Sequence, residues 1–229
     1  MTIAAIRPLS FIDYPKKLSA VIFFQGCNFK CSYCHNFWLL NKNNNLIPVE
    51  EFYGFLKRRI AKLDGVVLSG GEPTMWNNLF TIAKKIKSMG FSIKLDTNGY
   101  NPKIISTLLE RNLLDYIAMD IKGPLKKYSK IVNKKVNTSR IKQSIEIITQ
   151  SKIEYEFRTT LIRSLLSKND IVECGNLING AKKYCLQKFN PDTALDKKLK
   201  KEKPYSYNEF TDIKKELSPF VKQCEIRFE

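Results

Sequence analysis

Short apolar runs alternate along the chain with segments in which apolar residues recur at helical spacing. A continuous apolar run predicts a strand covered on both faces, as in a parallel sheet. Such runs occupy residues 18–24, 65–68, 91–95, 116–121, 153–162, 184–189 and 224–228. Helical spacing predicts helices over residues 48–60, 79–90, 101–109, 141–148, 171–178 and 210–220. Because parallel neighbours need helical crossovers, the alternation predicts an α/β fold with a parallel sheet.

The alternation by itself fits either an open doubly wound sheet or a barrel. The chain has 229 residues, and α/β barrels use about 200–250 residues for one domain. Two basic stretches, residues 126–135 and 196–203, interrupt the alternation and are predicted to be solvated loops. No linker divides the sequence, so we expect a single domain over residues 1–229.

Composition changes this picture little. The net charge of +17 comes mostly from lysines spread along the chain. No aromatic-plus-basic motif accompanies the charge, so we do not expect nucleic acid as a partner. No stretch approaches the roughly 18 apolar residues that span a bilayer. Residues 1–15 lack the pattern of a secretion signal, which predicts a cytoplasmic protein with reduced cysteines.

Three of the six cysteines, Cys27, Cys31 and Cys34, are crowded into the segment CNFKCSYCHN. In a reducing compartment this spacing favours metal ligands over disulfides, and thiolates are the ligands of iron–sulfur clusters. A [4Fe–4S] cluster has four irons, so three thiolates leave one iron open to a substrate. The alternative is a zinc site whose fourth ligand is His35 or one of the distant cysteines. Structural zinc sites usually pair their ligands in two separated knuckles, and the sequence has no second knuckle.

Polar residues follow the predicted strands at their C-terminal ends, where parallel α/β folds gather their ligand sites. They are Ser69 to Pro73, Asp96 to Gly99, Asp120 to Lys122 and Gln187 to Pro191, and the fifth strand itself carries Arg158. Alternate residues of a strand share a face. Two such faces hold Lys94, Asp96 and Asn98, and Ala118, Asp120 and Lys122. A polar ligand explains this convergence, because buried polar groups without partners are costly.

These residue types suit a ligand that has an amino-acid part, a ribose and a base. Gly70 and Gly71 permit close backbone approach, and Glu72 can accept hydrogen bonds from an ammonium group. The candidates for the other parts are Asp96 and Asp120 for ribose hydroxyls, Lys122 and Arg158 for a carboxylate, and Tyr33 for the base.

Four motifs, CNFKCSYCHN, SGGEPT, DTNG and AMDIK, together resemble the radical S-adenosylmethionine superfamily and its small glycyl-radical-enzyme activases. The sequence is most similar to the anaerobic ribonucleoside-triphosphate reductase activating protein family. The resemblance extends over nearly the whole chain, from SFIDYP at residues 10–15 through YEFRTT at residues 155–160 to LQKF at residues 186–189.

The resemblance implies an incomplete (β/α)6 parallel barrel of the radical SAM type. It also implies a [4Fe–4S] cluster, held by the three cysteines, that reductively cleaves S-adenosylmethionine to methionine and a 5′-deoxyadenosyl radical. That radical would take a hydrogen atom from a glycine of a partner glycyl radical enzyme, here anaerobic (class III) ribonucleotide reductase. The implied electron donor is a flavodoxin or ferredoxin.

The resemblance also assigns roles to single positions. Methionyl contacts fall on Gly70, Gly71 and Glu72, and Tyr33 and His35 match residues beside the adenine. Ribose and carboxylate contacts fall on Asp120 and Lys122, and Arg158 matches a basic residue of the same pocket. Asp96 and Asp120, with backbone at Thr97 and Ala118, match a monovalent cation site of some activases. Asn98 lies on the same predicted face as Asp96. Asn190 stands where related activases place a histidine near the nucleoside, and this difference puts that contact in doubt.

Two alternatives remain at this point. A radical SAM enzyme could act on a small molecule, a peptide or RNA, because fold and cleavage chemistry do not determine the substrate. A zinc-stabilised, non-catalytic binding module would leave the polar strand ends unexplained. A second cluster is not expected, since Cys174, Cys185 and Cys224 lack cluster spacing.

Overall fold

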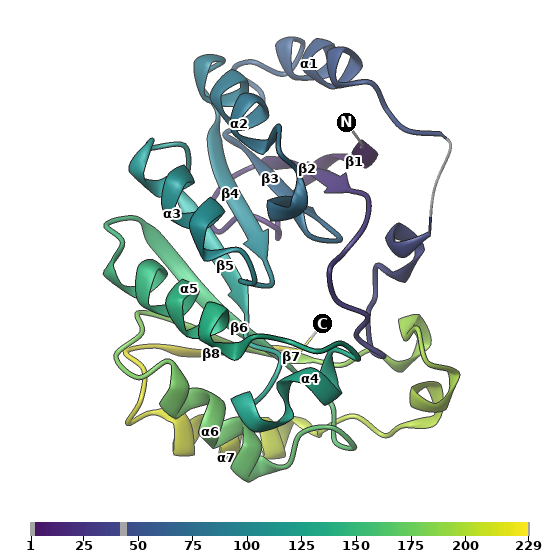
Figure 1. Cartoon of the computed structure of the whole chain (residues 1–229), viewed down its shortest axis with the longest axis vertical. Coiled ribbons are helices and arrows are strands. Elements are labelled where there is room, and N and C mark those ends of the chain that lie inside the picture. The colour runs from purple at the N-terminus through teal and green to yellow at the C-terminus, as the bar shows by residue number, and fades with distance from the viewer. Residues whose placement is uncertain (1–2, 42–44, 229) are drawn as a thin grey trace. The chain divides into compact units, whose positions relative to one another are not determined.

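The computed structural model describes residues 3–41 and 45–228. Its strands are β1 (Ile3–Ser10), β2 (Ser19–Phe24), β3 (Gly65–Gly70), β4 (Ser92–Thr97), β5 (Tyr116–Asp120), β6 (Glu154–Leu161), β7 (Tyr184–Lys188) and β8 (Cys224–Arg227). Its α-helices are α1 (Val49–Lys57), α2 (Leu79–Ser88), α3 (Pro102–Glu110), α4 (Tyr128–Ile131), α5 (Thr138–Gln150), α6 (Lys168–Leu177) and α7 (Tyr207–Leu217) (Figure 1).

Contacts divide the described residues into two compact units. The first holds residues 3–28, 38–41, 45–118 and 151–154, and the second holds residues 29–37, 119–150 and 155–228. The single domain expected from the sequence stays a prediction. Among residues 3–41 and 45–228, the helices are all too short or too polar to cross a bilayer.

In the first unit the strands lie in the order β1-β2-β3-β4. Strands β2, β3 and β4 are parallel, as predicted, with Val21 beside Val67 and Val67 beside Lys94. Helix α2 packs against β4 and buries Leu79 and Ile82 (Figure 1). The parallel pairing brings the C-terminal ends of β3 and β4 together, and the candidate site residues of this unit follow those ends.

Strand β1 was not predicted from the sequence. It runs antiparallel to β2, with register irregularities on either side of its central pairs. Its residues Arg7 to Leu9 are exposed, and Ile3, Ala4 and Ser10 are buried. Arg7 and Pro8 interrupt the apolar residues of this segment. It therefore has neither a continuous apolar run nor a strict apolar–polar alternation, the two patterns that predict a strand.

In the second unit β6, β7 and β8 are parallel neighbours in that order. One face of β6 and β7 carries Phe157 and Tyr184, which are fully buried. Helices α6 and α7 pack against each other, and each begins at a serine capping box (Figure 1). The opposite face of β6 carries Glu156 and Arg158, so the alternation separates an apolar face from a charged one.

Some predicted boundaries and loops are wrong. The first helix ends at Lys57, and Ile60 is 51% exposed, so the helical spacing of Ile60 was coincidental. The basic stretch 126–135 is not a solvated loop throughout, because it contains α4, with Tyr128 and Ile131 buried. The second basic stretch contains a short 3-10 helix, Lys197–Lys201, in which Leu199 is buried.

Candidate functional site

The carboxylate of Glu72 joins the ends of β3 and β4 in the first unit. Its Oε1 accepts hydrogen bonds from the Thr74 backbone at 3.1 Å, the Thr74 hydroxyl at 2.5 Å and the Thr97 hydroxyl at 2.8 Å. Its Oε2 accepts from the backbone N–H of Asn98 at 2.7 Å. Glu72 is 0% exposed, so these bonds satisfy a charge that burial would otherwise disfavour.

Burial raises the pKa of Glu72, and the hydrogen bonds from Asn98, Thr74 and Thr97 oppose that rise. All of these donors belong to the protein. The sequence suggested that Glu72 accepts from a ligand ammonium group, which stays a prediction. The structure shows a structural role for this side chain: the Glu72 carboxylate holds the Asn98 backbone beside the turn after β3.

Replacing Glu72 with glutamine tests the structural role of its carboxylate. We expect a loss of about 1–3 kcal/mol in the free energy of unfolding, because the new NH2 group faces an N–H or O–H donor in a buried place. Urea unfolding of the cluster-free protein measures it, with the exposed Glu51→Gln on α1 as the matched control. Equal stability of the two variants would show that the carboxylate is not held in this way.

Gly70 and Gly71 allow the end of β3 to pack closely against the start of the cysteine segment. A Cβ atom added to Gly71 would lie 1.8 Å from the carbonyl oxygen of Gly26. Gly70 has a φ of +123°, and a Cβ there would lie 2.3 Å from the backbone nitrogen of Phe24. Backbone hydrogen bonds from Gly71 to Phe24 and from Glu72 to Gly26, both 2.9 Å, tie the two segments together. The predicted close approach is therefore present, and its partner is the chain's own backbone before Cys27.

Cys27 lies next to the side chain of Asn98. The Nδ2 of Asn98 is 3.8 Å from the Cys27 sulfur and 2.6 Å from the Oδ1 of Asn28. Asn98 is 5% exposed, whereas Cys27 is partly exposed. The first unit thus brings together Cys27, the two glycines, Glu72 and Asn98.

Asp96 forms an ion pair with Lys94, as their shared face on β4 predicted. The Nζ of Lys94 is 2.6 Å from Oδ1 of Asp96, and the Lys94 side chain is 3% exposed. Lys94 also lies over the ring of Tyr116, at 5.9 Å from its centroid. A monovalent cation at Asp96 stays a prediction, and it would share this carboxylate with a buried ammonium group.

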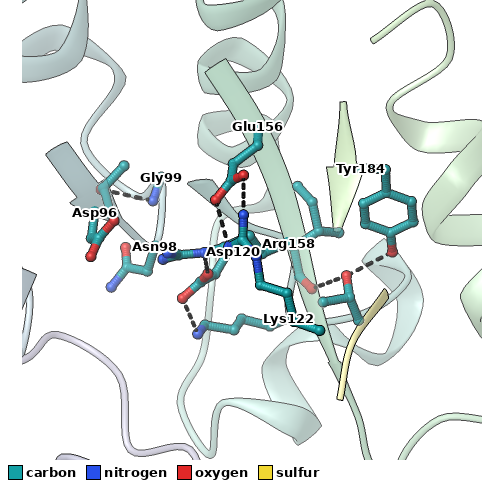
Figure 2. A network of polar contacts seen from close by, with 12 residues as sticks. Asp96, Asn98, Gly99, Asp120, Lys122, Glu156, Arg158 and Tyr184 are labelled. Carbon is teal, nitrogen blue, oxygen red and sulfur yellow. Dashed lines mark hydrogen bonds and ion pairs between the residues drawn. The ribbon is translucent and has the colours of Figure 1, made fainter. Parts of the chain in front are cut away.

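In the second unit the Asp120 carboxylate lies between two cations (Figure 2). Its Oδ1 is 2.8 Å from Nε of Arg158, and its Oδ2 is 2.8 Å from Nζ of Lys122. Burial opposes ionisation of Asp120, but Arg158 and Lys122 outweigh it and hold its pKa well below the usual range. For Lys122 burial is likewise outweighed by Asp120, and its pKa is raised.

Tyr33 and the two later cysteines of the motif lie near Lys122. The Lys122 Nζ is 5.9 Å from the centroid of the Tyr33 ring, and Tyr33 is buried. Burial raises the pKa of Cys31 and of Cys34, and Lys122 acts in the opposite direction on both thiols. The second unit thus brings together Cys31, Tyr33, Cys34 and the ion-paired Asp120, Lys122 and Arg158.

The two basic stretches hold the cysteine segment of this unit. The backbone N–H of Lys30 donates to the carbonyl of Val132 at 3.0 Å, and the Asn133 side chain donates to the carbonyl of Lys30 at 3.1 Å. The backbone N–H of Asp196 donates to the carbonyl of Ser32 at 2.8 Å. Stretches predicted to be solvated loops therefore position the residues on either side of Cys31.

His35 and Asn190 lie at the surface of the second unit. Partial burial of the ring and then the charge of Lys122 lower the pKa of His35. His35 is exposed, with its ring centroid 6.2 Å from that of Phe189. Asn190 is also exposed, and its Oδ1 accepts from the backbone N–H of Asp192 at 3.1 Å. The side-chain oxygen of Asn190 is thus used in a local turn, and a nucleoside contact by Asn190 stays a prediction.

Sequence reasoning missed Asn28 and Thr74 of the first unit, and it named Thr97 for its backbone but not for its hydroxyl, which donates to Glu72. The signal for Thr74 was present, because Glu72-Pro73-Thr74 has the pattern of a capping acid followed by a first-turn proline. No local signal marks Thr97 or Asn28, since their partners Glu72 and Asn98 are distant in sequence.

Comparison with known proteins places the chain in a family. Residues 21–170 match the family model described as the radical SAM superfamily. This range holds the three cysteines, the residues around Glu72 and Asn98 in the first unit, and the charged residues around Asp120 in the second. The chain belongs to the radical SAM superfamily. Its predicted cofactors, a [4Fe–4S] cluster and S-adenosylmethionine, are those of the superfamily. The prediction from the motifs that the chain is a radical SAM enzyme is also confirmed.

Relatives narrow the family further. A Methanocaldococcus jannaschii protein is provisionally named a glycyl-radical enzyme activating enzyme. It is 34% identical to this chain, and the match covers 98% of this chain and 95% of that protein. The pyruvate formate-lyase-activating enzyme of Clostridium pasteurianum is 34% identical over 52% of each chain. The radical SAM enzyme described here therefore belongs to the glycyl-radical enzyme activating enzymes.

The fold agrees with this membership. SuiB of Streptococcus suis, in its crystal structure bound to S-adenosylmethionine, matches 91% of this chain with a TM-score of 0.66 at 13% identity. The chain spans about half the length of SuiB, 51%. The predicted α/β fold of the radical SAM type is confirmed.

The residues of this radical SAM chain fit the cofactors of its family. Cys31 and Cys34 are thiols outside any disulfide, and Cys27 lies beside an amide donor. Across residues 3–41 and 45–228, no three His, Cys, Asp or Glu side chains are grouped to hold one metal ion. A [4Fe–4S] cluster takes one thiolate per iron, so its ligands need not surround a single ion.

Proposed function

We propose that the protein generates a glycyl radical on a partner enzyme, most specifically on anaerobic (class III) ribonucleotide reductase. The observation that carries this proposal is the 34% identity, over 98% of the chain, to the Methanocaldococcus jannaschii protein provisionally named a glycyl-radical enzyme activating enzyme. When bound and reduced, the cluster supplies one electron that cleaves S-adenosylmethionine to methionine and a 5′-deoxyadenosyl radical, which takes a hydrogen atom from the partner's glycine. The finer assignment, to the reductase, rests on the motif resemblance.

In the first unit we assign the residues around Cys27 to holding the cluster and the methionyl part of the substrate. By the motif resemblance, Cys27, Cys31 and Cys34 each supply a thiolate to the cluster. The backbone contact of Gly71 with Gly26 sets where the cysteine segment begins. Glu72 maintains that turn through its hydrogen bonds, and the backbone of Gly70 and Gly71 lies beside it.

In the second unit we assign Lys122 and Asp120 to the substrate's charged and ribose groups. An ammonium has three N–H donors, and Lys122 directs one of them at Asp120, so it can also donate to the methionyl carboxylate. Each oxygen of Asp120 can accept a second hydrogen bond, which suits ribose hydroxyls. Arg158 holds the Asp120 carboxylate in place.

The remaining predicted contacts complete the proposal. Tyr33, His35 and Asn190 would lie beside the adenosine part, and Asp96 would serve a monovalent cation. A flavodoxin or ferredoxin would deliver the electron, because a low-potential one-electron carrier is what the reaction requires.

The test is the glycyl radical itself. The cluster is reconstituted without oxygen, and the enzyme is mixed with reductant, S-adenosylmethionine and the anaerobic ribonucleotide reductase of the same cell. We expect the doublet of a glycyl radical in the electron paramagnetic resonance spectrum. Cys31→Ser should abolish the doublet, whereas Cys224→Ser, outside the candidate site, should leave it unchanged.

The same samples separate the alternatives. Release of 5′-deoxyadenosine without a doublet would contradict the reductase as the partner and favour a small molecule, a peptide or RNA. Bound zinc in place of iron and sulfide would refute radical chemistry altogether.

A further inference from the structure

The side-chain amide of Asn98 is directed at the sulfur of Cys27. The Nδ2 of Asn98 is 3.8 Å from the Cys27 sulfur, within the range of an N–H···S hydrogen bond, and 2.6 Å from Oδ1 of Asn28. An NH2 group has two N–H donors, so both contacts can be made at once. Asn98 is 5% exposed, which leaves little water to compete for the amide.

The orientation of this amide is fixed by its other atoms. The backbone N–H of Tyr100 donates to Oδ1 of Asn98 at 3.0 Å, which distinguishes the oxygen from the nitrogen of the amide. The backbone N–H of Asn98 donates to Oε2 of Glu72 at 2.7 Å. The buried Glu72 carboxylate and the Tyr100 backbone therefore hold the NH2 group toward the cysteine.

Ligation changes what the sulfur can do. As a thiol, Cys27 can donate to Oδ1 of Asn28, 3.7 Å away. As a thiolate on iron it has no proton, so the sulfur can only accept, and Asn98 provides a donor. A hydrogen bond to a ligating sulfur withdraws electron density from the iron and eases the arrival of one more electron.

We propose that Asn98 is a positioning residue that raises the reduction potential of the cluster through its hydrogen bond to Cys27. The inference deepens the proposed function and rests on Cys27 being a cluster ligand. It assigns to the turn after β4 an influence on electron entry, separate from any contact with S-adenosylmethionine.

The test measures the potential rather than turnover. Native enzyme and Asn98→Ala are loaded with cluster and titrated with a reductant in the absence of S-adenosylmethionine, and the reduced cluster is followed by electron paramagnetic resonance. We expect a lower midpoint in Asn98→Ala. The ratio of reduced to oxidised cluster at the native midpoint should fall about three- to tenfold, where tenfold equals about 59 mV for one electron.

Asn101→Ala is the matched control. The Asn101 amide donates to the carbonyl of Thr74 at 2.8 Å and to the Thr74 hydroxyl at 3.3 Å in the same unit, so these hydrogen bonds go to oxygen rather than to sulfur. Its midpoint should equal the native one. If Asn98→Ala loads too little iron, Asn98→Leu is titrated instead, because it keeps the approximate side-chain size and removes the donor without adding a charge.

The outcomes separate this inference from the proposed function. A loaded cluster with the native midpoint in Asn98→Ala or Asn98→Leu would overturn the inference and leave the function standing. An equal shift in Asn101→Ala would also overturn it, since the effect would then be a general loosening. A native chain that binds no cluster would instead refute the function.

Discussion

Gly71→Ala is expected to prevent cluster loading almost completely. The added methyl group would lie 1.8 Å from the Gly26 carbonyl oxygen and 3.2 Å from the backbone nitrogen of Cys27. These neighbours are backbone atoms, so relief requires the segment that begins the cysteine motif to move. Overpacking of this kind costs about 1–3 kcal/mol or more. The expected effect on loading is larger, because the proposed function makes Cys27 a ligand of the cluster.

Iron and sulfide content per chain after anaerobic reconstitution measures this effect, with thermal unfolding of the cluster-free protein alongside. Gly54→Ala on α1 is the matched control. Its new Cβ would meet only the end of the Arg58 side chain, at 3.6 Å, so it should load normally. It should also gain up to about 1 kcal/mol in stability, because alanine is the better helix former. Native iron content in Gly71→Ala would contradict the backbone contact.

Asp120→Asn is expected to abolish cleavage of S-adenosylmethionine and to destabilise the fold. Asparagine keeps the shape of the side chain but removes the negative charge between Lys122 and Arg158 and turns an NH2 group toward one of them. Breaking such a pair should cost about 2–4 kcal/mol, below the figure for full burial. The Asp120 side chain is 27% exposed, which is why we expect the smaller figure. Formation of 5′-deoxyadenosine and urea unfolding measure the two effects.

The dependence on pH gives the prediction a sign. The pKa of Asp120 is lowered in the folded protein. Its contribution to stability is therefore present above the unfolded pKa of about 4 and is lost as the pH falls toward the folded value. The difference in stability between native protein and Asp120→Asn should be full at neutral pH and shrink below about pH 4.

Asp212→Asn provides the control for Asp120→Asn. Asp212 forms an exposed pair with Lys215 at 3.6 Å on α7, and such pairs contribute about 0–1 kcal/mol. It should match the native protein in cleavage and nearly match it in stability. Equal stability losses in the two variants would show that the charges around Asp120 are not coupled.

The order of strands and helices could be predicted from the sequence because each element has a local signal. Strand β3 (Gly65–Gly70) forms where the aliphatic run Val66 to Leu68 is bounded by Gly65 and Ser69. The shared faces were also predictable, since period two places Lys94 beside Asp96 and Asp120 beside Lys122, and both pairs form ion pairs.

What could not be predicted depends on contacts between distant segments. The hydrogen bonds that Glu72 accepts from Thr97 and Asn98 could not be predicted. These donors lie at the end of β4 and just after it, and the register of β4 is not written near residue 72. The stretch 126–135 looked solvated because its lysines dominate the average composition. Tyr128 and Ile131 face inward at helical spacing within it, and the helix that holds them is only four residues long.

The contact between Gly71 and Gly26 also limits how this sequence can drift over evolutionary time. Every amino acid other than glycine carries a Cβ atom, so each replacement of Gly71 meets the same backbone obstacle, whatever its polarity. No gradual series of substitutions leads away from glycine there. In a descendant or homologous chain, a side chain at the Gly71 position would thus indicate, from its sequence alone, that the first cysteine of its motif had moved.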